Sequence, residues 1–276
     1  MSLLLNSLIT YGQIEIIIFG EHAILHEPVE RWPVVNCLIA FYSEGFPLDK
    51  AIAYVALRKP YCINDLPSQK LLLDRRLVYA QLEQLDIPTP RHVTLNRDKP
   101  PISKYRHGED WIEVDGQRVE KPFVEKPVHA EDHNLYIYYP ISQGGGGRKL
   151  FRKVNNESSK FHPELRHVRD SGSYIYEEFV EPDAVNDIKT YMVGSHICVQ
   201  TRKSPAFTST VLRTEEGREV RSCCTLSAEE LEVVARVARA FKQTVCGVDL
   251  LRANGKTYAL FLLHFLASHH LRQVCY

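Results

Sequence analysis

The sequence predicts a mixed α/β fold of the α+β type, with a small N-terminal α/β lobe at residues 1–98 and an antiparallel-sheet region at 99–276. The first part contains two continuous apolar runs and two stretches in which apolar residues recur at helical spacing. From about residue 100 the pattern changes to short alternating segments joined by turn residues. With 276 residues, 44% of them hydrophobic, the chain is long enough to bury a core in each part.

The N-terminal part begins with the runs IEIIIF (14–19) and CLIAFY (37–42). Both are continuous and apolar, which predicts two buried strands of a parallel sheet. Helical spacing follows between Pro47 and Lys59, and again over 67–86, where a proline stands at the start. The segment IPTPRHVTL then leads from this part into a strand.

The later part predicts an antiparallel sheet built from hairpins. Ser227 and Glu230 have the spacing of a capping box and predict a helix that runs to Lys242. The segment CGVDLLR should then pair with KTYALF across the turn Asn254-Gly255. The other expected strands are WIEV and QRVE across an Asp-Gly turn, PFVEKP, NLYIYYP, KLFRKV, SYIYEEFV, DIKTYMV and HICVQTRK.

Charge and cysteine usage exclude several classes of protein. Lys and Arg together number 34, as do Asp and Glu, so no global charge attracts nucleic acid or an anionic membrane. The seven cysteines are odd in number and contain no C-x-x-C pair, which favours reduced thiols in the cytosol. The start MSLLLNSLITYG lacks a basic region, and the apolar run 258–267 is too short to span a bilayer. We therefore expect a cytosolic protein without a transmembrane segment.

The segment QGGGGRKLFRK (143–153) places four glycines before a charged strand. Such a run is either a mobile hairpin tip or a place where the backbone approaches a ligand. In the following strand Arg152 and Lys153 point to opposite faces, so one of them can face a nucleotide. This alternation favours the second interpretation, in which Gly144–Gly147 folds over nucleotide phosphates.

Other charged residues stand at the ends of expected strands. Lys126 is followed by His133 after seven residues, Glu177 and Glu178 end another strand, and Asp249 lies on a late one. Each alone could be a solvated charge. Together they supply a lysine for phosphates, a strand whose backbone can bind an adenine edge, and a carboxylate for magnesium, which are the parts of a phosphoryl-transfer site.

Several segments resemble the kinase domain of the diphosphoinositol pentakisphosphate kinases, over a match from about residue 14 to 258. The resemblance implies an ATP-grasp-like fold with antiparallel nucleotide-binding lobes, ATP and Mg²⁺ as cofactors, and inositol hexakisphosphate or its pyrophosphates as substrates. The segments that carry it are PFVEKPVHAEDHNLYIYYP, LFRK, GSYIYEEF, DIKTYMVG, RKSPA and FKQTVCGVDLLRANG.

The resemblance also implies roles for individual residues. It assigns catalysis to Lys189, Arg202 and Asp249, with Asp249 as the metal ligand. It assigns ATP binding to Arg75, Lys126, His133, Arg152, Glu177, Glu178, Phe179, Val180, Asp187, Lys189, Ser204 and Asp249. It assigns substrate binding to Arg152, Lys153, Lys189, Arg202 and Arg221, and we expect these cations to converge because a polyphosphate needs several of them. The acceptor is itself a phosphate oxygen, so alignment and charge neutralisation should suffice without a carboxylate base.

Both ends of the chain depart from the family pattern. The family's first strand and the lysine-rich turn after it have no counterpart in this sequence, so we expect that substrate contact to be lacking. The family's Asp-x-Asn metal ligands align with Phe261 and Leu263, which carry no oxygen. The tail offers His264, His269 and His270, and imidazole is a poor ligand for magnesium.

These departures leave more than one hypothesis open. The first is an inositol phosphate kinase that binds nucleotide more readily than it turns it over. The second is a nucleotide or inositol phosphate binding module without turnover. A third is another ATP-grasp enzyme, a carboxylate–amine ligase, which would need a less basic second site.

Overall fold

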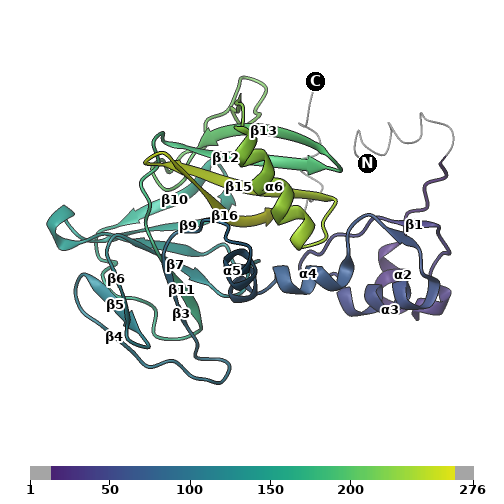
Figure 1. Ribbon diagram of the computed structural model, residues 1–276, viewed down its shortest axis with the longest axis horizontal. Helices are drawn as coiled ribbons and strands as arrows, with labels where there is room; N and C mark the ends of the chain where they lie inside the picture. The colour runs from purple at the N-terminus through teal and green to yellow at the C-terminus, as the bar shows by residue number, and fades with distance from the viewer. Residues whose placement is uncertain (1–13, 265–276) are drawn as a thin grey trace.

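The computed structural model describes residues 14–264, with side chains as far as Leu260, and contains four β-sheets flanked by short helices (Figure 1). The helices are α2 (Glu21–His26), α3 (Leu48–Arg58), α4 (Leu66–Leu72), α5 (Arg75–Gln84) and α6 (Ala228–Ala240), with 3₁₀ turns η1 (Val29–Arg31) and η2 (Ile141–Gln143). The strands of the N-terminal part and of the three-stranded sheet are β1 (Cys37–Leu38), β2 (Tyr61–Cys62), β4 (Tyr105–His107), β5 (Trp111–Val114) and β6 (Gln117–Glu120).

Two larger antiparallel sheets form the rest of the molecule. The six-stranded sheet has the order β10-β9-β8-β7-β11-β3, and the five-stranded sheet has the order β14-β13-β12-β15-β16. Strands of the first are β3 (His92–Leu95), β7 (Phe123–Pro127), β8 (Leu135–Tyr138), β9 (Gly147–Val154), β10 (Glu157–His162) and β11 (Tyr174–Glu178). Strands of the second are β12 (Asn186–Val193), β13 (His196–Lys203), β14 (Ser222–Cys223), β15 (Val245–Ala253) and β16 (Lys256–His264).

The N-terminal lobe contains the expected parallel pair, but with a different partner. Strand β1 pairs in parallel with β2, while 14–19 forms no strand, and Ile18 is 59% exposed. The prediction of a strand at 14–19 is therefore wrong. The run is held instead by its last side chain, because Phe19 packs edge-on against the rings of Trp32 and Tyr54 at 5.9 and 5.6 Å. An apolar run can thus be anchored by one aromatic contact without joining a sheet.

The helix expected over 67–86 is divided in two. Helix α4 ends at Leu72, and α5 begins at Arg75 after Asp74, whose carboxylate accepts a hydrogen bond from the amide of Arg76 at 3.0 Å. A side chain that satisfies the free amides of a first turn favours a new start, so Asp74 overrides the continuous apolar spacing. The helix expected between Pro47 and Lys59 is confirmed as α3.

The predicted hairpins are confirmed. Strands β5 and β6 join across Asp115 and Gly116 with φ of 49° and 83°, and β15 and β16 join across Asn254 and Gly255 with φ of 52° and 72°. Paired positive φ values are the geometry of the tightest hairpin turns. The capping box at the start of α6 is also present, although the helix ends at Ala240 rather than Lys242.

One hydrophobic core holds both large sheets together. Helix α6 packs across the five-stranded sheet, and α5 lies between the two sheets (Figure 1). The buried members of this core are Leu72, Val78, Tyr79, Leu82, Ile87, Ile175, Ile188, Val234, Val237, Phe241, Val248, Leu250 and Ala259.

Within residues 14–264 no helix combines the length and apolarity that crossing a bilayer requires. The six cysteines in this range are free thiols. Cys246 is buried in β15, and burial raises the pKa of its thiol to about 12, which keeps it protonated and unreactive.

Candidate functional site

A buried ion pair lies where strands β12 and β15 run side by side. Lys189 faces Asp249 across the two strands, and its Nζ lies 2.5 Å from Asp249 Oδ2. Burial is the largest influence on both groups: it lowers the pKa of Lys189 and raises the pKa of Asp249, and each partner opposes the shift of the other. The pair brings together two of the residues assigned to catalysis, on adjacent strands of the five-stranded sheet.

The third residue assigned to catalysis, Arg202, lies close by on β13. It faces Asp187 across β12 and β13, with Nε 3.6 Å from Asp187 Oδ2. Its charge also contributes to the lowered pKa of Lys189. Asp187, Lys189 and Arg202 are therefore presented by two adjacent strands at one end of the five-stranded sheet.

Three cations from separate segments meet at one carboxylate, that of Glu219. Arg221 Nη2 lies 3.0 Å from it, Arg202 Nη1 lies 3.4 Å from it and Lys153 Nζ lies 3.6 Å from it. Although burial alone would raise it, these cations lower the pKa of Glu219 to about 2. The structure thus brings together three of the five cations that the sequence analysis expects to converge, whereas Lys189 pairs with Asp249 and Arg152 pairs with Glu131.

Glu219 itself was not among the predicted site residues. The one signal for it in the sequence is the alternation Glu219-Val220-Arg221, which places its carboxylate on the same side of an extended segment as Arg221. Arg221 also donates to the Tyr191 hydroxyl at 2.7 Å and to Gln200 Oε1 at 3.1 Å. These partners hold the guanidinium in one orientation.

The cation cluster contains hydrogen-bond donors that no protein group uses. The Nε atoms of Arg202 and Arg221 are buried without a hydrogen-bond partner. Beside them lies a cavity of about 240 Å³, lined among others by Arg202, Lys203 and Glu219. A buried donor without an acceptor is unfavourable, so this cluster is suited to a ligand that carries several oxygen acceptors.

Arg75 lies under the neighbouring loop and contacts backbone. Its side chain is almost fully buried, and Nη1 and Nη2 donate to the carbonyls of Pro127, His129, Ala130 and Asp132 at 2.5, 2.7, 3.0 and 3.3 Å. Four carbonyl contacts from one guanidinium fix the course of the loop that leads to His133. Through these four hydrogen bonds Arg75 stabilises the conformation of that loop.

His133 lies between this loop and the cations. Burial, followed by the charges of Arg152 and Arg75, lowers its pKa to about 4, and Lys189 contributes in the same direction. Arg152 is mostly exposed and pairs with Glu131 at 2.9 Å, whereas Lys153 pairs with Glu219. The expectation that these two neighbours on β9 face different surroundings is confirmed, and His133 is a neutral group that can donate or accept.

Lys126 forms a second buried ion pair on the six-stranded sheet. Its Nζ lies 2.8 Å from both oxygens of Glu177 and 3.1 Å from the Tyr79 hydroxyl, which in turn donates to Glu177. Burial, followed by the negative charge of Glu177, raises the pKa of Tyr79 well above its ordinary value. Lys126 and Glu177 are thus joined, and Tyr79 is the member of this group that the sequence did not indicate.

The segment after β11 connects the two large sheets. The amides of Glu178 and Phe179 donate to the carbonyls of Arg91 and Pro122 at 2.8 and 3.0 Å, and the ring of Phe179 packs against that of Phe207 at 5.9 Å. Phe207 follows Ser204, which is buried and whose carbonyl accepts the amide of Phe207 at 3.2 Å. Ser204 therefore shapes the turn that brings Phe207 to Phe179.

The glycine run does not lie at this site. It connects β8 to β9 at the end where Tyr138 pairs with Gly147 and with Phe123, and β7 reaches Lys126 only at its opposite end. The prediction that Gly144–Gly147 folds over nucleotide phosphates is wrong, because the direction of β9 puts Arg152 and Lys153 at the far end of the strand. The run forms the hairpin tip that was the alternative interpretation, and it closes the turn between β8 and β9 through the bond from the amide of Tyr139 to the carbonyl of Gly146 at 3.0 Å.

Several predictions fall on the C-terminal residues. The side chains of Phe261 and Leu263, and those of His264, His269 and His270, lie outside the described residues. Among the side chains that are described, no group of three or more His, Cys, Asp and Glu residues could hold a metal ion. Asp249 remains the expected metal ligand.

Comparisons with known proteins were made for the whole chain. A family model described as diphosphoinositol pentakisphosphate kinase 2 N-terminal domain matches residues 1–74. The inositol hexakisphosphate and diphosphoinositol-pentakisphosphate kinase of Saccharomyces cerevisiae is 49% identical over 280 residues, which cover 93% of this chain and 24% of the yeast protein. The human kinase 2 of the same description is 51% identical over 261 residues, covering 94% of this chain and 21% of that protein.

Among solved structures, the D-alanine–D-alanine ligase of Bacillus anthracis matches with a TM-score of 0.53 at 12% sequence identity, over 92% of this chain and 78% of that one. At this identity the likeness shows the ATP-grasp fold and nothing about the reaction. The chain spans about a quarter of the length of the curated relatives it matches. With about half of its residues identical to theirs over nearly its whole length, the chain belongs to the family of inositol hexakisphosphate and diphosphoinositol-pentakisphosphate kinases.

Proposed function

We propose that this chain transfers a phosphoryl group from ATP to a phosphate of inositol hexakisphosphate or diphosphoinositol pentakisphosphate, forming an inositol pyrophosphate. The observation that carries the proposal is the meeting of Lys153, Arg202 and Arg221 at one point, from three segments of a chain with no net charge. The names of the relatives, which are about 50% identical, support the same substrates. The ATP-grasp fold supports nucleotide binding between the two large sheets.

The cation cluster fits the acceptor. A substrate with a phosphate on every ring carbon needs several cations at fixed positions, and guanidinium forks match phosphate oxygens. The unpaired Nε donors of Arg202 and Arg221 would receive acceptors from such a substrate. Lys203, which lines the adjacent cavity, adds a further positive charge.

The six-stranded sheet would hold the nucleotide. Arg152 and the neutral His133 lie where phosphates would approach, and Lys126 stands below them in its pair with Glu177. Because the amides of Glu178 and Phe179 are already used, the amide of Val180 is the next donor along the chain that could meet an adenine edge. Phe179, packed on Phe207, would supply an apolar wall beside it.

Magnesium fits this site through a single strong ligand. Mg²⁺ usually takes one or two carboxylates, together with waters and substrate phosphates. Asp249 would supply a carboxylate, and Asp187 is near enough to influence its pKa. When bound with nucleotide, the ion neutralises charge on the phosphates.

The residues themselves would act by alignment. The attacking phosphate oxygen is already deprotonated, so no side chain has to remove a proton. Lys189, which pairs with Asp249, and Arg202, which belongs to the cation cluster, would hold the two phosphates in line and offset their mutual repulsion.

Calorimetric titration tests this proposal directly. Inositol hexakisphosphate should bind the chain in the presence of Mg²⁺ and a non-hydrolysable ATP analogue, and the Arg202→Ala variant should bind at least about thirtyfold more weakly because two or more charge-assisted contacts are lost. Arg106→Ala, which removes an exposed arginine on β4, is the control and should bind as the wild type does. Equal affinities for the wild type and Arg202→Ala would contradict the assignment of the substrate site.

A further inference from the structure

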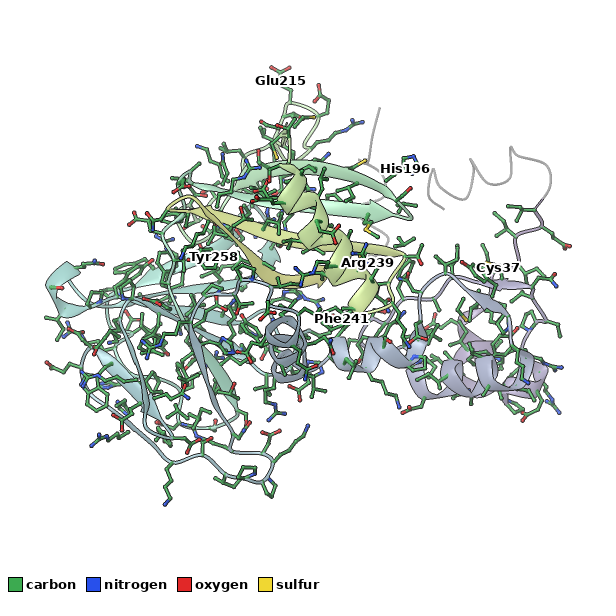
Figure 2. All side chains as sticks on the ribbon, in the orientation of Figure 1. Cys37, His196, Glu215, Arg239, Phe241 and Tyr258 are labelled. Atoms are coloured by element: carbon green, nitrogen blue, oxygen red, sulfur yellow. The ribbon has the colours of Figure 1, made fainter. Side chains whose placement is uncertain are left out.

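Glu219 lies on a short hairpin that covers the cation cluster. The amide of Val220 donates to the carbonyl of Leu212 at 2.9 Å, the amide of Thr214 donates to the carbonyl of Arg218 at 2.7 Å, and Arg213 forms a β-bridge with Glu219. We refer to residues 212–220 as the cover hairpin. Its outer tip carries Glu215, which projects away from β13 (Figure 2).

The inner side of the cover hairpin is attached to the rest of the protein through charge. The Glu219 carboxylate, only 10% exposed, is shared by Arg202 of β13, Arg221 before β14 and Lys153 of β9. Its depressed pKa means that it is ionised at neutral pH. Glu219 is therefore the anion that balances these cations within the chain.

The same three cations are the ones that the proposed function assigns to the substrate. The Glu219 carboxylate lies 3.0–3.4 Å from Nη atoms of Arg202 and Arg221. A phosphate bound to the same Nη atoms would lie directly beside this carboxylate, and two adjacent anions repel each other. The buried Nε atom of Arg221, however, has no hydrogen-bond partner, and that of Arg202 has only the Asp187 carboxylate at 3.6 Å, which is too far for a hydrogen bond. The Glu219 carboxylate thus pairs with all three cations but leaves hydrogen-bond donors of the two arginines unused.

We infer that Glu219 is an internal counter-ion of these three cations and that a polyphosphate ligand displaces it. This inference rests on the proposed function. In the empty site Glu219 fastens the cover hairpin over Lys153, Arg202 and Arg221. A ligand with several phosphates satisfies the same cations and can also reach the Nε donors that make no hydrogen bond, so it replaces Glu219 and releases the hairpin. Glu219 therefore opposes ligand binding while it stabilises the empty protein.

The opposite signs of these two effects provide the test. In Glu219→Gln the competing charge is lost, so inositol hexakisphosphate should bind about tenfold more tightly, a coupling of the size usual between linked sites. The melting temperature without ligand should fall, because three ion pairs are removed. Glu215→Gln makes the same change in net charge at the exposed tip of the same hairpin and should change neither quantity.

Three outcomes are distinguishable in one series of titrations. If wild type binds inositol hexakisphosphate and Glu219→Gln binds no more tightly than Glu215→Gln, Glu219 is a positioning residue and this inference is overturned while the proposed function stands. If the wild type does not bind the ligand, the proposed function fails and this inference fails with it. Tighter binding with a lower melting temperature, seen in Glu219→Gln alone, supports it.

Hydrogen exchange tests the displacement of Glu219 in the wild-type chain, so the result does not depend on whether a variant folds. Saturating inositol hexakisphosphate should increase exchange at the amides of Thr214 and Val220, since the hairpin loses its attachment when Glu219 is displaced. Exchange at the amide of Ala259, which bonds the carbonyl of Pro88 away from the cluster, should not rise. Increased protection of Thr214 and Val220 by the ligand would show that the hairpin closes with Glu219 in place, and would overturn the inference.

Discussion

The two ends of strand β9 differ in what makes them conspicuous and in what they do. One end, at Gly147, follows the glycine run, and the other carries Arg152 and Lys153 about 17 Å further along an extended strand. The glycine end is the more unusual in sequence, yet it lies away from every residue of the candidate site. The charged end, followed by the unremarkable turn Asn155-Asn156, meets both His133 and Glu219.

The difference shows that glycine is used here for close packing within the fold. A Cβ on Gly147 would lie 2.7 Å from the carbonyl oxygen of Ile137, and one on Gly146 would lie 2.9 Å from that of His162. Gly146 also has φ of +78°, which favours glycine. The run is therefore needed to bring the strands of the hairpin and the end of β10 together, whereas the other end depends on side-chain charge.

The largest expected effect is on the rate of turnover. Turnover needs metal ligands in addition to the cations at the charged end of β9. Restoring oxygen ligands with Phe261→Asp and Leu263→Asn should speed the formation of pyrophosphate product about a hundredfold, because a misplaced γ-phosphate costs about that much in rate. The assay supplies ATP, Mg²⁺ and inositol hexakisphosphate. Phe261→Ala with Leu263→Ala separates the gain of ligands from the loss of two apolar side chains, and similar product from the wild type and the restored chain would show that these ligands are not needed.

Gly147→Ala should break the glycine end without touching the charged end. The added methyl group meets backbone rather than a movable side chain, so we expect the free energy of unfolding to fall by about 2–3 kcal/mol. Gly145→Ala meets nothing closer than 4.0 Å and should lose only about 1 kcal/mol through its left-handed backbone. Urea unfolding measures both, and ligand affinity of the folded Gly147→Ala protein should be unchanged. A large loss of ATP affinity in either variant would show that the glycine run takes part in nucleotide binding.

Two lysines of β9, one toward each end, compare its ends most directly. Lys153→Ala should weaken inositol hexakisphosphate binding about tenfold through the loss of one phosphate contact. Lys149→Ala, four residues nearer the glycine end and stacked over the ring of Tyr136 at 5.0 Å, should leave it unchanged. Calorimetry on both variants measures the difference, and equal losses would mean that binding follows the total charge of the strand.

The pH dependence of stability should report the Glu219 contacts at the charged end. The pKa of Glu219 is lowered from 4.5 to about 2 in the folded chain, so its stabilising contribution is fully present above pH 4.5 and is lost as the pH falls toward 2. Urea unfolding between pH 5 and 2.5 should therefore show a smaller decline for Glu219→Gln than for the wild type. Equal declines in the wild type and Glu219→Gln would show that another carboxyl group causes the loss of stability at low pH.

The smallest effect is an expected absence of change. Hydrogen exchange across 142–149 should be the same with and without saturating ATP and Mg²⁺, since the glycine run lies at the wrong end of β9 to meet phosphates. The amides of 152–156 serve as the internal comparison and should become protected. Protection of 142–149 as well would show that the run reaches the nucleotide in the bound protein.

Much of the candidate site could be named from the sequence because its segments resemble a known family, but the contacts within it could not. Lys126 and Glu177 are indicated separately by strand-end charge, yet only the pairing of β7 with β11 joins them to Tyr79. Arg75 is expected to bind phosphates, and its described contacts are to four backbone carbonyls that the sequence did not indicate. These partners lie between 47 and 98 residues apart in the chain, so local patterns carry no information about them.

The sequence by itself determined the elements whose causes are local. Asn254-Gly255 and Asp115-Gly116 set hairpins through backbone conformation, Ser227 and Glu230 set the start of α6 by satisfying free amides, and alternation set the two faces of β9. Only the tertiary structure decided that 14–19 does not join a sheet, that the glycine run lies far from the cations, and that Glu219 stands among them. Turns and caps are fixed by neighbours along the chain, whereas the partner of a strand and the counter-ion of a buried charge are fixed by which surfaces the whole core brings together.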